Sequence, residues 1–171
     1  MLQFCGGRAL SPFRLEKLLK EINTLNLPVF TVHTEYWHFC SVTRNLRDEE
    51  LGALKMLLND DATQENMQHP GEFFLVLPRP GTISPWSTKA TDIAHHCGLT
   101  VVERIERGIA FYIQSDVQLS ANDKASLIPL IHDRMTEAVF DSFDDASRLF
   151  QHYEPKPLNV IDVMHGGMEA L

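Results

Sequence analysis

One segment of the chain combines a rigid turn with the start of a helix, an arrangement that can bind an anion. Residues 78–82 read Pro-Arg-Pro-Gly-Thr, in which proline fixes φ and glycine permits a sharp turn, and Ser84-Pro85 then begins a helix. The free N–H groups and the dipole of a helix start favour a phosphate or a carboxylate. The alternative is an ordinary capped helix with Arg79 in solvent. The residues expected to form this anion cradle are Arg79, Gly81, Thr82, Ser84, Ser87 and Lys89.

The histidines, which are common metal ligands, show no metal-binding spacing. His95 and His96 are adjacent, so their side chains diverge on a helix. His33 and His38 are five residues apart, which places them on opposite faces of a regular strand. No HExxH pattern occurs, and we therefore predict no metal site.

The three cysteines are Cys5, Cys40 and Cys97, an odd number at wide spacings. They fit neither a disulfide framework nor a CxxC metal site. Their spacing assigns no role to any of them, but Cys97 lies on the apolar side of a predicted helix and is expected in the core. Unpaired thiols are typical of a reducing compartment, so we expect a cytoplasmic protein.

The composition fits a globular domain that binds neither nucleic acid nor a membrane. The chain has 171 residues, of which 44% are hydrophobic and 22% are charged. A chain of this length buries roughly 70% of its unfolded surface. Its net charge of −8 disfavours nucleic acid and anionic lipid, because both attract basic surfaces. No stretch approaches the ~20 apolar residues that span a bilayer, and the N-terminus lacks the pattern of a secretory signal.

Helical and strand periodicities alternate along the chain and predict an α+β fold. Apolar residues recur at helical spacing behind Ser11-Pro12, and residues 29–42 are rich in β-branched and aromatic residues, as in a long strand. The alternation in that strand changes phase, so we expect a bulge or a bend near Glu35. Further elements are expected as a helix over 51–58, a strand over 73–77, a helix over 85–97, a strand over 101–113, a helix after Ser120, a strand over 136–140 and a helix over about 142–152.

The two halves of the chain repeat the same order of elements. Ser11-Pro12-Phe13 recurs as Ser84-Pro85-Trp86 at an offset of 73 residues. We therefore predict two similar strand–helix–strand–helix–strand halves, about 1–68 and 72–140, with antiparallel sheets and pseudo-twofold symmetry. Chance matching of a generic element order is the alternative. The side chains expected between helices and sheet are Leu18, Ile22, Leu54, Leu57, Ile93, Leu127 and Ile131.

Longer motifs carry a resemblance to a known family. The sequence resembles the N-terminal region of large, single-chain phosphoribosylformylglycinamidine synthase, and the resemblance covers nearly all of the chain. The motifs that carry it are RPGTISPWSTKATDIAHHCGL (79–99), EYWHF (35–39), ERIERG (103–108), HDRM (132–135), and Asp144-Asp145 followed by Leu149-Phe150.

The resemblance implies one domain of a ligase of purine biosynthesis. The full enzyme converts formylglycinamide ribonucleotide to formylglycinamidine ribonucleotide, using ATP, magnesium and ammonia drawn from glutamine. Its N-terminal region is similar in fold to a dimer of the small accessory subunit of multi-subunit versions. The family's ATP ligands, metal ligands and glutaminase Cys–His–Glu triad have no counterparts in this sequence. We therefore expect no catalytic residue and no cofactor in this chain, and no activity from it alone.

The resemblance also implies an organisation and a set of partners. We expect an accessory domain over residues 1–153 and the start of a linker over 154–171, as in an excised N-terminal domain. Its partners would be the synthase core and the glutaminase domains of the same full-length chain. It would dock on the synthase core and help shape the pocket for formylglycinamide ribonucleotide or ammonia. One alternative is a free-standing module that acts in trans on separate synthase and glutaminase chains. A third hypothesis is a small-molecule sensor that uses the Arg79–Lys89 cradle.

Overall fold

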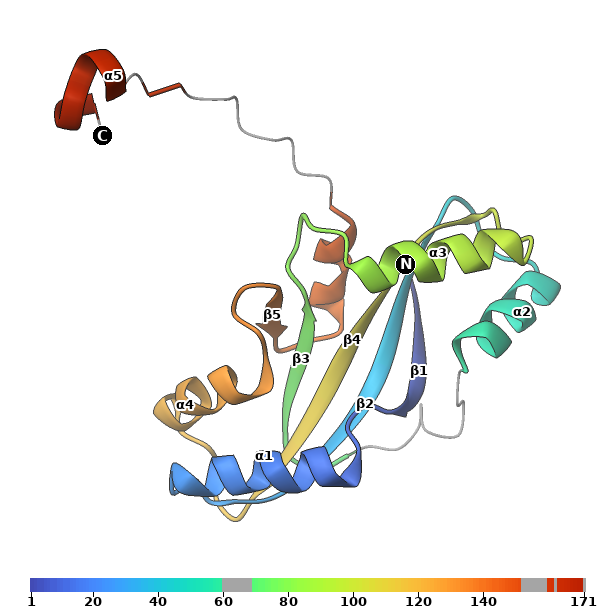
Figure 1. The fold of residues 1–171 in the computed structure, drawn as a ribbon. Coiled ribbons are helices and arrows are strands. Elements are labelled where there is room, and N and C mark those ends of the chain that lie inside the picture. The colour runs from blue at the N-terminus through green and yellow to red at the C-terminus, as the bar shows by residue number, and fades with distance from the viewer. Residues whose placement is uncertain (60–68, 152–159, 162, 171) are drawn as a thin grey trace.

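The computed structural model describes residues 1–59, 69–151, 160–161 and 163–170, and contains one five-stranded antiparallel sheet of order β1-β2-β4-β3-β5 (Figure 1). The predicted α+β class is confirmed. The strands are β1 (Leu2–Arg8), β2 (Val29–Val42), β3 (Glu72–Pro78), β4 (Val102–Ser115) and β5 (Glu137–Phe140). The helices are α1 (Pro12–Thr24), α2 (Asp48–Leu58), α3 (Pro85–His96), α4 (Ala121–Ile131) and α5 (Val163–Gly166), with 3₁₀ helices η1 (Asp144–Phe150) and η2 (Gly167–Ala170).

The element bounds are consistent with the predicted repeat. Helix α3 begins 73 residues after α1, and each helix has proline at its first position and a serine N-cap, Ser11 or Ser84. Strand β4 and helix α4 likewise begin 73 residues after β2 and α2, with matching lengths of 14 and 11 residues. The pseudo-twofold symmetry and the likeness to an accessory-subunit dimer stay predictions.

Three apolar clusters join the helices to the sheet. Figure 1 shows α1 crossing one end of the sheet and α3 crossing the other. The first cluster packs α1 and α4 on the sheet and contains Ile22 and Leu127, and the second packs α2 and α3 and contains Leu54 and Cys40. The third lies beside η1 and contains Phe39. Phe39 and Cys40 are adjacent in β2 and face opposite sides, so the central strand is buried on both faces.

Burial on both faces, and not a bulge, explains the phase change in β2. Glu35 pairs regularly with Ala110 of β4, so the predicted bulge or bend does not interrupt that pairing. A register shift does occur at Glu35 in the pairing with β1, between Cys5, opposite Trp37, and Arg8, opposite Glu35, and the extra residue lies in β1. In a strand that is buried on both faces, apolar and polar residues do not have to alternate strictly along the sequence.

Most of the predicted core is buried, but three residues are not. Ile93 is 53% exposed and Leu57 is 37% exposed. The stripe of α3 that packs on the sheet runs through Ala90 and Ala94, so Ile93 lies one position outside it. Cys97 is also exposed, at the C-cap of α3, and its prediction as a core residue is wrong. The predicted core residues that are buried are Leu18, Ile22, Leu54, Leu127 and Ile131.

The last part of the chain differs in helix type from the prediction. The helix expected over about 142–152 is the 3₁₀ helix η1 (Asp144–Phe150). The end of the predicted accessory domain, residues 152–153, and the first part of the predicted linker, residues 154–159, lie outside the described residues, so these boundaries stay predictions. In the part of the chain that the structure describes, no helix is long and apolar enough to cross a membrane.

Truncation of a core leucine should show which faces of α2 and α4 contribute to the stability of the folded chain. Leu54 and Leu127 are fully buried, so replacing either with alanine should lower the free energy of unfolding by about 2–5 kcal/mol. Leu57→Ala, on the exposed side of α2, should cost less than about 1 kcal/mol. Urea denaturation measures all three. Equal losses for Leu54→Ala and Leu57→Ala would contradict the described packing of α2.

Candidate functional site

The loop between β3 and α3 contains the predicted turn. The backbone N–H of Thr82 donates to the carbonyl oxygen of Arg79 (3.2 Å), and Gly81 has a φ of 82°. With Pro80 before the glycine, this is a type II turn. Because Pro80 fixes its own φ and Gly81 tolerates the positive value, the turn keeps its shape without a ligand.

A buried carboxylate of the protein itself lies at the start of α3. Ser84, the N-cap, donates its backbone N–H to Glu106 Oε1 (3.2 Å) and its hydroxyl to Glu106 Oε2 (2.8 Å). Glu106 is fully buried, and Arg104 also donates to its Oε1. Arg104 further donates to the carbonyl oxygens of Thr82 (2.6 Å) and Leu149 (3.0 Å). Glu106 thus supplies the negative charge that a helix start favours, and an external anion would compete with it.

The predicted cradle residues lie in different surroundings. The Arg79–Thr82 turn is largely exposed, whereas Ser87 is 1% exposed. The Ser87 hydroxyl has no hydrogen-bond partner among the described residues. Lys89 is exposed and lines a groove between α2 and α3, while Ser84 contacts Glu106. Anion binding by these residues stays a prediction.

The groove between α2 and α3 is apolar and open. Its volume is about 310 Å³. Two of its lining side chains, Leu57 and Ile93, are exposed, and Met56 of α2 is 85% exposed. Apolar side chains that gather at the surface are typical of a contact with another protein. The residues that line the groove are Leu57, Leu58, Trp86, Lys89, Ala90 and Ile93.

A pocket of about 210 Å³ near the start of α3 contains a cation held by aromatic rings. The Arg107 guanidinium lies 4.3 Å from the ring centroid of Tyr36 and 4.6 Å from that of Trp86. His38 stacks on Trp86, and burial together with the charge of Arg107 lowers the pKa of His38 to about 4. His38 is therefore neutral at pH 7, and Arg107 supplies the positive charge. Ser84 also lines this pocket.

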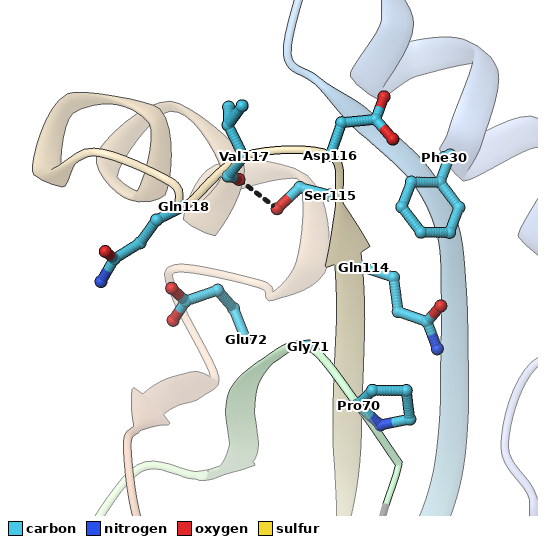
Figure 2. Close-up of a pocket in the computed structure, with 9 residues that line it drawn as sticks. All are labelled: Phe30, Pro70, Gly71, Glu72, Gln114, Ser115, Asp116, Val117 and Gln118. Carbon is cyan, nitrogen blue, oxygen red and sulfur yellow. Dashed lines mark hydrogen bonds between the residues drawn. The ribbon is translucent and has the colours of Figure 1, made fainter.

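Figure 2 shows another pocket, of about 450 Å³, at the end of the sheet where β3 begins and β4 ends. Two of its polar side chains, Ser115 and Glu72, are engaged within the protein. The Ser115 hydroxyl donates to the carbonyl oxygen of Val117 (2.6 Å), and Glu72 accepts from Lys124 (2.6 Å). This pocket therefore gives no evidence of a specific ligand.

Three side chains that could bind a metal lie together near β2. His33 and Glu35 belong to β2, and His69 lies shortly before β3. Their ligand atoms lie within 4.8 Å of one another, and in the described part of the chain they are the group of three with such spacing. The prediction of no metal site compared His33 with His38 and did not consider Glu35, which is two residues away on the same face. Nothing in the sequence indicated that His69 would join them.

Other residues of these sites were also missed. Glu106 and Arg107 belong to a motif that was quoted only as part of the family resemblance. Their alternating charges gave no sign that Glu106 would be buried. Tyr36 and Trp86 could have indicated the Arg107 contact, since surface aromatic residues often pack on arginine.

One family comparison bears on these sites. A family model described as formylglycinamide ribonucleotide amidotransferase N-terminal matches residues 35–150. The match begins within β2 and ends with the last residue of η1, so it includes the α2–α3 groove, the β3–α3 turn and Glu106.

Proposed function

Because the chain belongs to the formylglycinamide ribonucleotide amidotransferase N-terminal family, we propose that it is the non-catalytic N-terminal domain of a phosphoribosylformylglycinamidine synthase. The match over residues 35–150 carries this proposal. Such a ligase converts formylglycinamide ribonucleotide to formylglycinamidine ribonucleotide in purine biosynthesis. The resemblance assigns the ATP, the magnesium and the glutamine-derived ammonia of that reaction to its other domains.

The domain acts by docking on the synthase core through the groove between α2 and α3. Leu57, Ile93 and Met56 are exposed in the chain and gain stability when another surface covers them. A fully buried side chain of this size contributes about 1.5–3 kcal/mol. Lys89 at the same groove adds a charge that can pair with an acidic group of the core.

The turn from Arg79 to Thr82 helps shape the pocket for the ribonucleotide or the route for ammonia. The turn is preformed and exposed, and Arg79 carries a charge suited to phosphate. The side chain of Arg79 donates to the carbonyl oxygen of Met135 (3.3 Å), which holds it beside the turn.

The isolated chain should catalyse neither half of the reaction. We expect no protein-dependent formation of ADP or glutamate when the purified chain is incubated with ATP, magnesium, glutamine and formylglycinamide ribonucleotide. The reason is that the nucleotide site and the glutaminase nucleophile lie in other domains. Coupled assays for both products measure this, with the complete ligase as the positive control. Turnover by the pure chain would contradict a non-catalytic role.

The alternative, a free-standing module that acts in trans, predicts a different gene structure from that of the same-chain domain. A coding frame that continues past Leu171 for many hundreds of residues supports the same-chain domain, whereas a stop codon supports the module. The sensor hypothesis requires tight binding of a nucleotide or a ribonucleotide phosphate by the isolated chain, which isothermal titration measures.

A further inference from the structure

His33, Glu35 and His69 form a cluster that the proposed function does not use. His33 and Glu35 are two residues apart in β2, so their side chains leave the same face of the sheet. His69 lies just before β3, which is not a neighbour of β2 in the sheet. The Nε2 atoms of His33 and His69 lie 3.0 Å and 2.9 Å from a single atom, Glu35 Oε1.

The carboxylate of this cluster is buried and held in place. The side chain of Glu35 is 2% exposed, that of His69 is 11% exposed and that of His33 is 32% exposed. A buried carboxylate is stable only when it is paired, hydrogen-bonded or bound to a metal. The Cys5 thiol lies 3.8 Å from Glu35 Oε2 and 3.5 Å from the carbonyl oxygen of Gly6, while Glu35 Oε1 faces the two imidazoles.

Two of the three separations between ligand atoms are close to those around a tetrahedral ion, and all three ligand atoms lie within 4.8 Å of one another. Bonds of about 2.0–2.1 Å to nitrogen and oxygen place neighbouring ligand atoms about 3.3 Å apart. The present separations from Glu35 Oε1, 2.9 Å and 3.0 Å, are slightly shorter. The imidazole rings are stacked, with centroids 3.8 Å apart and 24° between their planes, so one ring must rotate before both lone pairs meet one ion. His33 is the more exposed of the two and has room to rotate.

The ligand types select the class of ion. Two imidazoles and one carboxylate suit zinc and neighbouring transition metals and leave a further position for water. Magnesium prefers oxygen ligands in octahedral geometry, so the cluster does not fit the magnesium that the family resemblance implies. A pocket of about 450 Å³, lined in part by His69, Phe73 and Tyr112, gives a path from solvent.

We propose that His33, Glu35 and His69 bind one divalent transition-metal ion of the zinc class, with water completing its coordination. The ion joins β2 to the segment that leads into β3. Because it binds the folded chain and not the unfolded chain, it raises the melting temperature.

Titration of the metal-free chain tests the proposal. The chain is stripped with a chelator and titrated with Co²⁺, whose visible absorption intensifies when it enters a low-coordinate site, and then with Zn²⁺ in competition. We expect saturation at one ion per chain, displacement of Co²⁺ by Zn²⁺ and a rise in melting temperature with Zn²⁺. Absence of saturable binding in the parent chain would overturn the proposal.

Variants assign the ligands. His33→Gln and His69→Gln should each weaken binding by at least about tenfold, since each removes one protein ligand. His96→Gln, at an exposed position of α3, is the matched control and should bind as the parent does. Circular dichroism checks that each variant folds. If His69→Gln does not fold, His33→Gln, which lies at the more exposed position, still tests the proposal. Unchanged affinity in a folded His33→Gln chain would also overturn the proposal.

Discussion

Replacing Glu106 with alanine should lower the free energy of unfolding by about 3–5 kcal/mol, the scale expected when one partner of a buried charge pair is removed. Glu106 is fully buried and accepts from Arg104 and from both the backbone and the hydroxyl of Ser84. Its loss leaves the Arg104 guanidinium, 19% exposed, without its carboxylate and removes the anchor at the start of α3. Urea denaturation followed by circular dichroism measures the effect.

A neighbouring glutamate provides the control for this prediction. Glu103 lies in the same strand, is exposed, and accepts from the hydroxyl of Ser41 (2.7 Å). Glu103→Ala should change the free energy of unfolding by no more than about 0.5 kcal/mol. A similar small loss for Glu106→Ala would show that the buried carboxylate does not hold the β3–α3 loop.

An aspartate in the groove between α2 and α3 should leave the isolated chain folded and impair the complete ligase. Ile93 is 53% exposed, so Ile93→Asp should change the melting temperature of the isolated chain little. In the docked state the same carboxylate would be buried without a partner, which costs about 1–3 kcal/mol and weakens association by about 5- to 150-fold. Glutamine-dependent formation of formylglycinamidine ribonucleotide measures the loss.

An equally exposed residue away from the groove controls for the added charge. Val117, 61% exposed in the loop after β4, is not among the groove residues, and Val117→Asp should leave the ligase unaffected. If the ligase with Ile93→Asp keeps the activity of the parent enzyme, the groove is not part of the docking surface.

Arg79→Ala and Lys89→Ala should leave the melting temperature of the isolated chain nearly unchanged. In the complete ligase, the same substitutions should raise the substrate KM or weaken ammonia-dependent turnover.

The element order was predictable because its signals are local. Ser11-Pro12 and Ser84-Pro85 cap helices through contacts within one turn, so their sequence alone indicates α1 and α3. The exposure of Ile93 was not predictable, because helical spacing defines the edge of an apolar stripe only to within about one residue.

The candidate sites depend on contacts that the sheet topology creates. Glu106 meets Ser84 because β4 passes beneath the start of α3, which no spacing between these residues indicates. His69 reaches Glu35 across a sequence separation of 34 residues, from a polar stretch that had no periodicity. The turn at Gly81 was predictable, but its neighbour Glu106 determines how much of the helix start is left for a ligand.

We propose that this chain docks on a synthase core and supports its reaction. The most direct test supplies the purified chain to a ligase from which the corresponding N-terminal region has been removed, and measures glutamine-dependent formation of formylglycinamidine ribonucleotide together with sedimentation. We expect the truncated ligase to be impaired, the parent chain to form a one-to-one complex and restore activity, and the Ile93→Asp chain to do neither. Full activity of the truncated ligase, with no complex formed, would contradict it.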